Sequence, residues 1–114
     1  MKHTSLDGLV EEQLLAARQA PAARAAHTVH GGREHALRQT VVALLADQSL
    51  AEHESPGEAT LQVLRGRVRL TAGTDSWVGT AGELVTIPET RHSLDALEDS
   101  AVLLTVVVTA QDSA

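Results

Sequence analysis

The sequence predicts a single all-β domain, a sandwich or a barrel, preceded by one short α-helix. Three observations predict this fold class. Short apolar or alternating runs recur roughly every eight to twelve residues after the first quarter of the chain. Glycine-containing turns separate these runs, and a helical period is confined to the first twenty or so residues. A chain of 114 residues is long enough to bury a core of its own.

Composition excludes several classes of function. Fifteen acidic and nine basic side chains give a net charge of −6, which argues against nucleic-acid and anionic-membrane partners. The chain has no cysteine, so disulfides, thiolate metal sites and a cysteine nucleophile are excluded. The first residues lack the apolar run of a signal peptide, and we therefore expect a cytoplasmic protein. The only aromatic residue, Trp77, is expected to pack on the barrel or at a subunit contact.

The N-terminal segment predicts a helix from about Ser5 to Gln19. Ser5 suits the N-cap position, and Pro21 stops the helix because proline lacks a donor and disfavours helix in the preceding residue. A short helix is marginal alone, so its apolar stripe must cover another surface. That stripe consists of Leu6, Leu9, Val10, Leu14 and Ala17. We expect residues 1–26 to form the helix and a linker, and residues 27–114 to form the barrel.

The strands are expected in order along the rest of the chain. A short strand at 27–30 and a turn at Gly31 and Gly32 come first. The apolar run at 36–46 is long enough for a helix, but its β-branched residues favour a strand. Further strands are expected at 60–64, 67–71, 76–78, 84–87, 91–96 and 101–109. The last is apolar on both faces, so one face meets the barrel core and the other meets the helix or a second subunit. A homodimer is therefore expected.

Two blocks of sequence each carry one histidine on an expected hairpin arm. The first contains His53 and continues to Gly66 through Val63-Leu64-Arg65. The second runs from Gly82 to Pro88 and is followed by His92. The two blocks resemble the paired motifs of the cupins, the germin-like family of small barrels. The resemblance implies a cupin double-stranded β-helix, also called a jelly-roll barrel, that follows the N-terminal helix and associates as a dimer.

The same resemblance implies a divalent metal held inside the barrel by three histidines and a glutamate. Counted along the motifs, these positions fall on His53, Ser55, Ala59 and His92. Of these four residues, only the two histidines have side chains suited to binding a metal, because alanine has no donor atom and serine is a poor ligand. Iron, manganese, zinc or nickel would need a third protein ligand.

Glu58 and His35 are the candidates for that third ligand. Glu58 is one residue out of phase with the family's glutamate, which in a regular strand turns it to the other face. The turn at Pro56 and Gly57 can break this phase, so Glu58 stays a candidate. His35 and Gln39 are expected on an earlier strand, from which they would reach in from the opposite wall.

Two functions from different classes remain open, with a purely structural partner protein as a third. The first is a barrel that binds a small molecule without chemistry. The second is a metal-dependent oxygenase or isomerase of small molecules that uses His53, His92 and a third ligand. Alternatively, the two histidines hydrogen-bond one another or face a polar pocket. The expected pocket residues are His53, His92, Gln39, Leu61, Val63 and Leu84.

Overall fold

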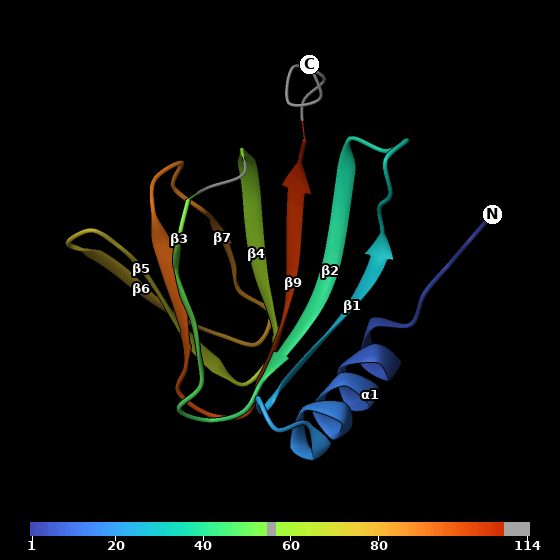
Figure 1. Cartoon of the computed structure of the whole chain (residues 1–114), viewed down its shortest axis with the longest axis horizontal. Coiled ribbons are helices and arrows are strands. Elements are labelled where there is room, and N and C mark those ends of the chain that lie inside the picture. The colour runs from blue at the N-terminus through green and yellow to red at the C-terminus, as the bar shows by residue number, and fades with distance from the viewer. Residues whose placement is uncertain (55–56, 109–114) are drawn as a thin grey trace.

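The computed structural model describes residues 1–54 and 57–108. The chain forms two antiparallel sheets packed face to face, with one helix against the outside of the larger sheet (Figure 1). The elements in order are α1 Leu6–Gln19, β1 Arg24–His30, β2 Leu37–Leu44, β3 Ser49–His53, β4 Glu58–Arg65, β5 Arg67–Ala72, β6 Asp75–Thr80, β7 Leu84–Thr86, β8 His92–Ala96 and β9 Ser100–Val107. The expected all-β fold with a short N-terminal helix is confirmed.

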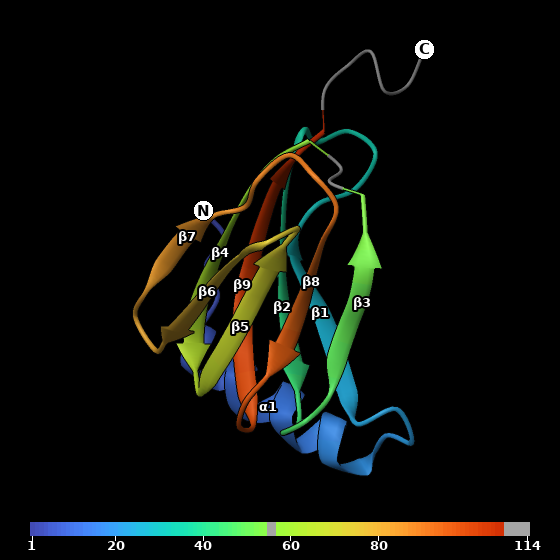
Figure 2. The same ribbon diagram turned by 90° about the vertical axis from the view of Figure 1, so that its left-hand side faces the viewer.

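The strand order is that of a jelly roll, because strands distant in sequence lie side by side. The large sheet has the order β1-β2-β9-β4-β7 and the small sheet the order β3-β8-β5-β6. Figure 2 shows the small sheet in front of the large one, with β6 and β7 at one open side. Each sheet therefore ends at this side in an edge strand, β7 in the large sheet and β6 in the small one.

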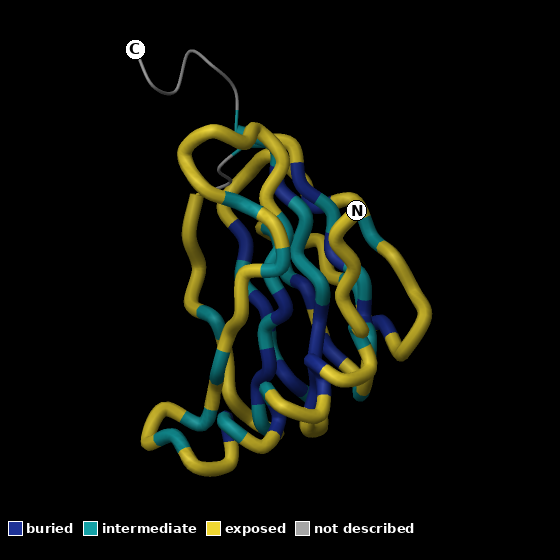
Figure 3. Tube along the Cα trace, turned by 90° about the vertical axis from the view of Figure 1, so that its right-hand side faces the viewer, coloured by how far each residue is buried: buried dark blue, intermediate teal, exposed yellow. Residues whose placement is uncertain are grey.

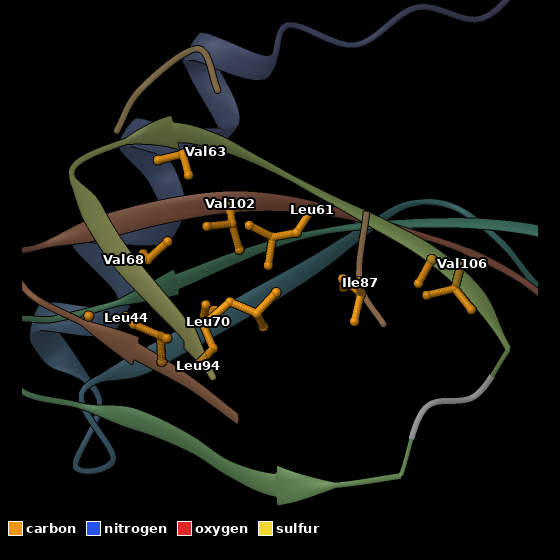
Figure 4. Close-up of a cluster of buried hydrophobic side chains, with 11 residues drawn as sticks. Leu44, Leu61, Val63, Val68, Leu70, Ile87, Leu94, Val102 and Val106 are labelled. Atoms are coloured by element: carbon orange, nitrogen blue, oxygen red, sulfur yellow. The ribbon is translucent and has the colours of Figure 1, made fainter. Parts of the chain in front are cut away.

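The core lies between the two sheets and is made almost wholly of aliphatic side chains (Figure 4). Alternation along β4 places Ala59, Leu61 and Val63 inside, while Glu58 and Arg65 are exposed. Buried residues concentrate in the central strands and exposed ones at the loops and edges (Figure 3). The other large core members are Leu44, Val68, Leu70, Ile87, Leu94, Val102 and Val106.

Helix α1 covers the outer face of the large sheet at one end. Ser5 caps it as predicted, and its Oγ accepts a hydrogen bond of 3.1 Å from the Gly8 N–H. The helix buries Val10, Leu14 and Ala17 against small strand residues, among them Ala43 and Ala101. Small side chains on the strands let the helix approach the sheet closely. The final strand therefore has two buried faces, one in the barrel core and one under the helix.

Two boundaries differ from those expected from the sequence. Strand β1 begins at Arg24 rather than at 27, because Ala25 has a small side chain that fits beneath the helix as part of the sheet. Strand β9 ends at Val107, and the expected end at Thr109 lies outside the described residues. Within the described ranges, no helix is long and apolar enough to cross a membrane.

Candidate functional site

His53 and His92 lie beside one another on neighbouring strands. Strand β3 pairs with β8, and the register places the two histidines directly opposite each other. Their ring centroids are 4.5 Å apart and the rings meet edge to face at 63°. His92 is only 5% exposed, whereas His53 is exposed at the end of its strand. The motif spacing thus predicted two residues that the fold brings into contact.

Each imidazole is oriented by a backbone carbonyl two residues earlier in the chain. His53 Nδ1 lies 3.0 Å from the Ala51 oxygen, and His92 Nδ1 lies 2.9 Å from the Thr90 oxygen. A carbonyl can only accept, so Nδ1 is the protonated nitrogen in both rings. In the neutral imidazole, Nε2 then carries the lone pair. The pair therefore presents two acceptor nitrogens rather than a hydrogen bond between the rings.

Arg91 holds the carboxylates that lie closest to the histidines in sequence. Its Nε donates to Glu52 Oε1 at 3.0 Å, and its Nη1 donates to Glu54 Oε1 at 3.1 Å. The hydrogen bond with Glu52 contributes most to raising the pKa of Arg91 above its ordinary value, followed by that with Glu54. Arg91 therefore stays charged throughout the neutral range. These carboxylates neutralise a cation on the surface and are not aimed into the barrel.

A small apolar cavity of about 40 Å³ lies beside the histidine pair, between the sheets. Its lining includes Val42, Leu50, His53, Leu61, Leu70, Ile87, His92, Leu94, Val102 and Leu104. Within the described ranges, the two imidazoles are thus the polar part of this lining. Every other lining residue that the structure describes is aliphatic, so the described part of this wall offers no polar group besides the imidazoles.

The residues present do not make up the ligand set of a resident metal centre. Ala59, at the position of the family's glutamate, is 4% exposed on the inner face of β4 and has no donor atom. Glu58 is exposed on the other face, as strand alternation requires, and Ser55 lies outside the described residues. No group of three histidine, aspartate or glutamate side chains within the described ranges can hold a metal. Two nitrogens fall short of the three or more protein ligands that such centres use.

His35 and Gln39 do not reach the cavity, which corrects two expectations. His35 lies in the loop before β2, where its ring is 4.5 Å from that of His30 and its Nε2 is 3.8 Å from Glu34 Oε1. Gln39 lies on the outer face of the large sheet, and its Nε2 donates to Thr105 Oγ1 at 3.3 Å. Both side chains belong to surfaces that the sheet separates from the barrel interior.

Two of the three aliphatic residues that were expected to line the pocket do not line the cavity. Leu61 lines the cavity, but Val63 is fully buried in the core away from it. Leu84 is 63% exposed, because the short strand β7 turns Val85 rather than Leu84 toward the interior. The sequence reasoning missed Leu50, Ile87 and Leu94. Leu94 lies two residues after His92 on β8, and this alternation was the available signal. Leu50 lies three residues before His53 across an irregular register, so alternation would have placed it on the opposite face.

Solved structures with this architecture decide the fold. A cupin superfamily protein from Desulfitobacterium hafniense matches with a TM-score of 0.69 at 11% identity, over 75% of this chain and 78% of that chain. An RmlC-like cupin from Desulfovibrio desulfuricans matches with a TM-score of 0.64 at 24% identity, over 74% and 81%. The fold is that of the cupins. The family resemblance expected from the sequence is confirmed at the level of fold.

A third solved structure matches nearly the whole chain. It is a conserved protein of unknown function from Streptococcus pyogenes, with a TM-score of 0.72 at 24% identity, covering 96% of this chain and 91% of that chain. No protein-family model and no curated protein matches the sequence. The protein is thus a small cupin-fold domain whose activity the comparisons leave open.

Proposed function

We propose that the protein is a small-molecule-binding barrel whose ligand donates a hydrogen bond to the histidine pair. The observation that carries this proposal is the orientation of the two imidazoles. Each Nδ1 is bonded to a backbone carbonyl, so each Nε2 is an acceptor, and no described residue donates to either. A ligand hydroxyl or N–H would supply the missing donor.

The cavity sets the size of the ligand group that enters. About 40 Å³ is little more than the share of liquid volume taken by one water molecule, and drug-sized ligands use about 300–1,000 Å³. The ligand would therefore place one small apolar group against Leu61 and Ile87 and leave the rest at the mouth. Such a ligand combines a donor with a short aliphatic end, as a small alcohol does.

The competing function is a metal-dependent oxygenase or isomerase that uses the same two histidines. Metal-binding histidines also have their second nitrogen bonded to a carbonyl or carboxylate, which is the one observation in its favour. Against it, the described residues offer no third ligand beside the two histidines. The cytoplasmic location expected from the sequence stays a prediction.

A titration of untagged protein with 1-propanol, followed by long-range ¹H–¹⁵N spectra of the imidazoles, tests the proposal. We expect Nδ1-protonated tautomers and a saturable shift of both Nε2 signals that a chelator does not alter. Removing the acceptor in His53→Ala should weaken binding by roughly 3- to 10-fold, the value of one neutral hydrogen bond.

The exposed His27 on β1 provides a matched control, since His27→Ala removes an imidazole that does not line the cavity. That variant should bind as the parent does. Near one transition metal per chain by elemental analysis, lost in His53→Ala, would replace the binding proposal by the enzyme hypothesis. Nε2 signals that do not respond to propanol in metal-free protein would also overturn it.

A further inference from the structure

A second cleft, separate from the histidine pair, lies at the open side of the sandwich. It has a volume of about 260 Å³ and lies between edge strands β6 and β7. Figure 2 shows these two strands at the same side of the sandwich. Its lining includes Leu70, Asp75, Ser76, Trp77, Val85 and Thr86. Leu70 is the only described residue that lines both this cleft and the cavity beside the histidines.

Trp77 forms an aromatic wall of the cleft and is held in place by the strand beneath it. Alternation along β6 places Asp75, Trp77 and Gly79 on one face, with Leu70 opposite Trp77 on β5. The indole lies over Gly79 so closely that a Cβ there would come within 2.7 Å of ring atom Cζ3. The ring also packs against the core cluster. The sequence-based expectation that Trp77 packs on the barrel is met, and Trp77 also lines the cleft.

The charge of the cleft is negative. Among the described residues, Asp75 is the one ionisable group that lines the cleft, and none of the others forms an ion pair with it. Ser76 and Thr86 add hydroxyls, and the remaining lining is apolar. The whole chain carries a net charge of −6, which favours the approach of cations. An anion would find no basic group in this lining.

We propose that this cleft binds a small organic cation, an ammonium group with a short apolar body. The electron-rich face of an indole attracts cations, most strongly quaternary ammonium groups, and a nearby carboxylate adds a direct charge attraction. The apolar walls from Leu70 and Val85 would cover the hydrocarbon part of the ligand. The volume lies near the lower limit for ligand pockets, which restricts the body to a few carbon atoms.

Trp77 reports this binding directly, because the chain contains no other tryptophan and no tyrosine or phenylalanine. Choline is the probe, and its emission titration is compared with that of 3,3-dimethyl-1-butanol, which has the same shape without the charge. We expect a saturable change in Trp77 emission with choline. The neutral analogue should bind at least about tenfold more weakly.

Three variants identify the site. Asp75→Asn keeps the shape of an exposed side chain and removes the charge, so we expect choline affinity to fall about tenfold or more. Glu12→Gln on α1 removes the same charge outside the cleft and should leave affinity unchanged. His53→Ala should also leave choline affinity unchanged, because His53 does not line this cleft. This variant therefore distinguishes binding in the cleft from binding at the histidine pair.

Several outcomes would overturn the proposal. One is equal affinity for choline and its neutral analogue, and another is choline binding that survives in Asp75→Asn. Loss of choline binding in His53→Ala would move the site to the histidine cavity. Absence of any saturable change, both in Trp77 emission and in the backbone amide shifts of β6 and β7, would remove the site altogether.

Discussion

Gly66 is a position at which the neighbouring backbone leaves no room for a side chain. It has φ +85°, and a Cβ there would lie 2.8 Å from Ser100 Cα and closer still to the Asp99 carbonyl oxygen. Gly82 has a similar φ of +92° but open space around the position of a Cβ. Both glycine positions of the cupin-like motifs therefore need a residue that tolerates a positive φ, but only at Gly66 is there also no space for a Cβ.

This difference predicts unequal effects of the same substitution. Gly66→Ala adds steric overlap to the strain of a positive φ and should lower the free energy of unfolding by about 2–5 kcal/mol. Gly82→Ala adds only the backbone strain and should lower it by about 1–2 kcal/mol. Urea unfolding followed by Trp77 fluorescence measures both. Equal losses would show that the close approach of the 98–100 turn to Gly66 does not matter.

At the residue scale, the sequence predicted the histidine pair but not all of its surroundings. The resemblance to the cupin motifs implied one site for His53 and His92, and the register of β3 with β8 places them side by side. The sequence-based prediction failed at Leu84 and Gln39, since their neighbours Val85 and Thr40 fit a strand equally well on either face. Where two adjacent residues are both compatible with the interior, alternation cannot tell which one points inward.

Strand β3 shows how an element can depend on contacts outside its own ladder. It is an edge strand that pairs only with β8, and its register is irregular between Leu50 and His53. The ion pairs of Arg91 with Glu52 and Glu54 connect this irregular part to the start of β8. Side chains thus hold a segment that has lost part of its backbone pairing.

Arg91→Gln should therefore loosen β3 without unfolding the domain. We expect amide hydrogen exchange in β3 to rise by roughly two- to fivefold at low ionic strength and by less in high salt, since exposed ion pairs are weak and screened. Arg69→Gln on β5 is the matched control, because Arg69 forms no ion pair with any described residue. The same rise in both variants would assign the effect to net charge instead.

Elements were easier to predict than the contacts between them. The helix ends at Gln19 as expected, because Ser5 and Pro21 are local signals that act on the backbone directly. The apolar run of β2 was ambiguous by length, and its β-branched residues indicated the correct state. Whether a third ligand joins the two histidines was not predictable from the sequence, because the answer depends on which strands face each other across the barrel.

At the scale of the whole molecule, two hydrophobic clusters share the same strands. Leu44 and Val102 belong to the cluster between the sheets, while their neighbours Ala43 and Ala101 belong to the cluster under α1. The outer face of the large sheet continues beyond the helix with exposed apolar residues such as Leu84. The homodimer expected from this face stays a prediction. Within one chain, the shared strands should make the helix and the barrel a single cooperative unit.

A destabilising substitution in the helix should therefore shift the unfolding transition reported by Trp77, which lies on the other side of the large sheet. Leu14 is 1% exposed, and Leu14→Ala should lower the free energy of unfolding by about 2–5 kcal/mol, or the melting temperature by roughly 10 °C or more. Leu15→Ala changes a neighbour that is 55% exposed, at the same helix propensity, and should change stability by less than about 0.5 kcal/mol.

The decisive measurement compares two signals during thermal unfolding of Leu14→Ala. Far-ultraviolet circular dichroism follows the helix and strands together, and Trp77 emission follows the space between β5, β6 and β7. If the clusters are coupled through β2 and β9, both transitions shift by the same amount and remain coincident. A transition seen by circular dichroism alone, with Trp77 emission unchanged, would mean that the helix is a separate layer that the barrel does not need.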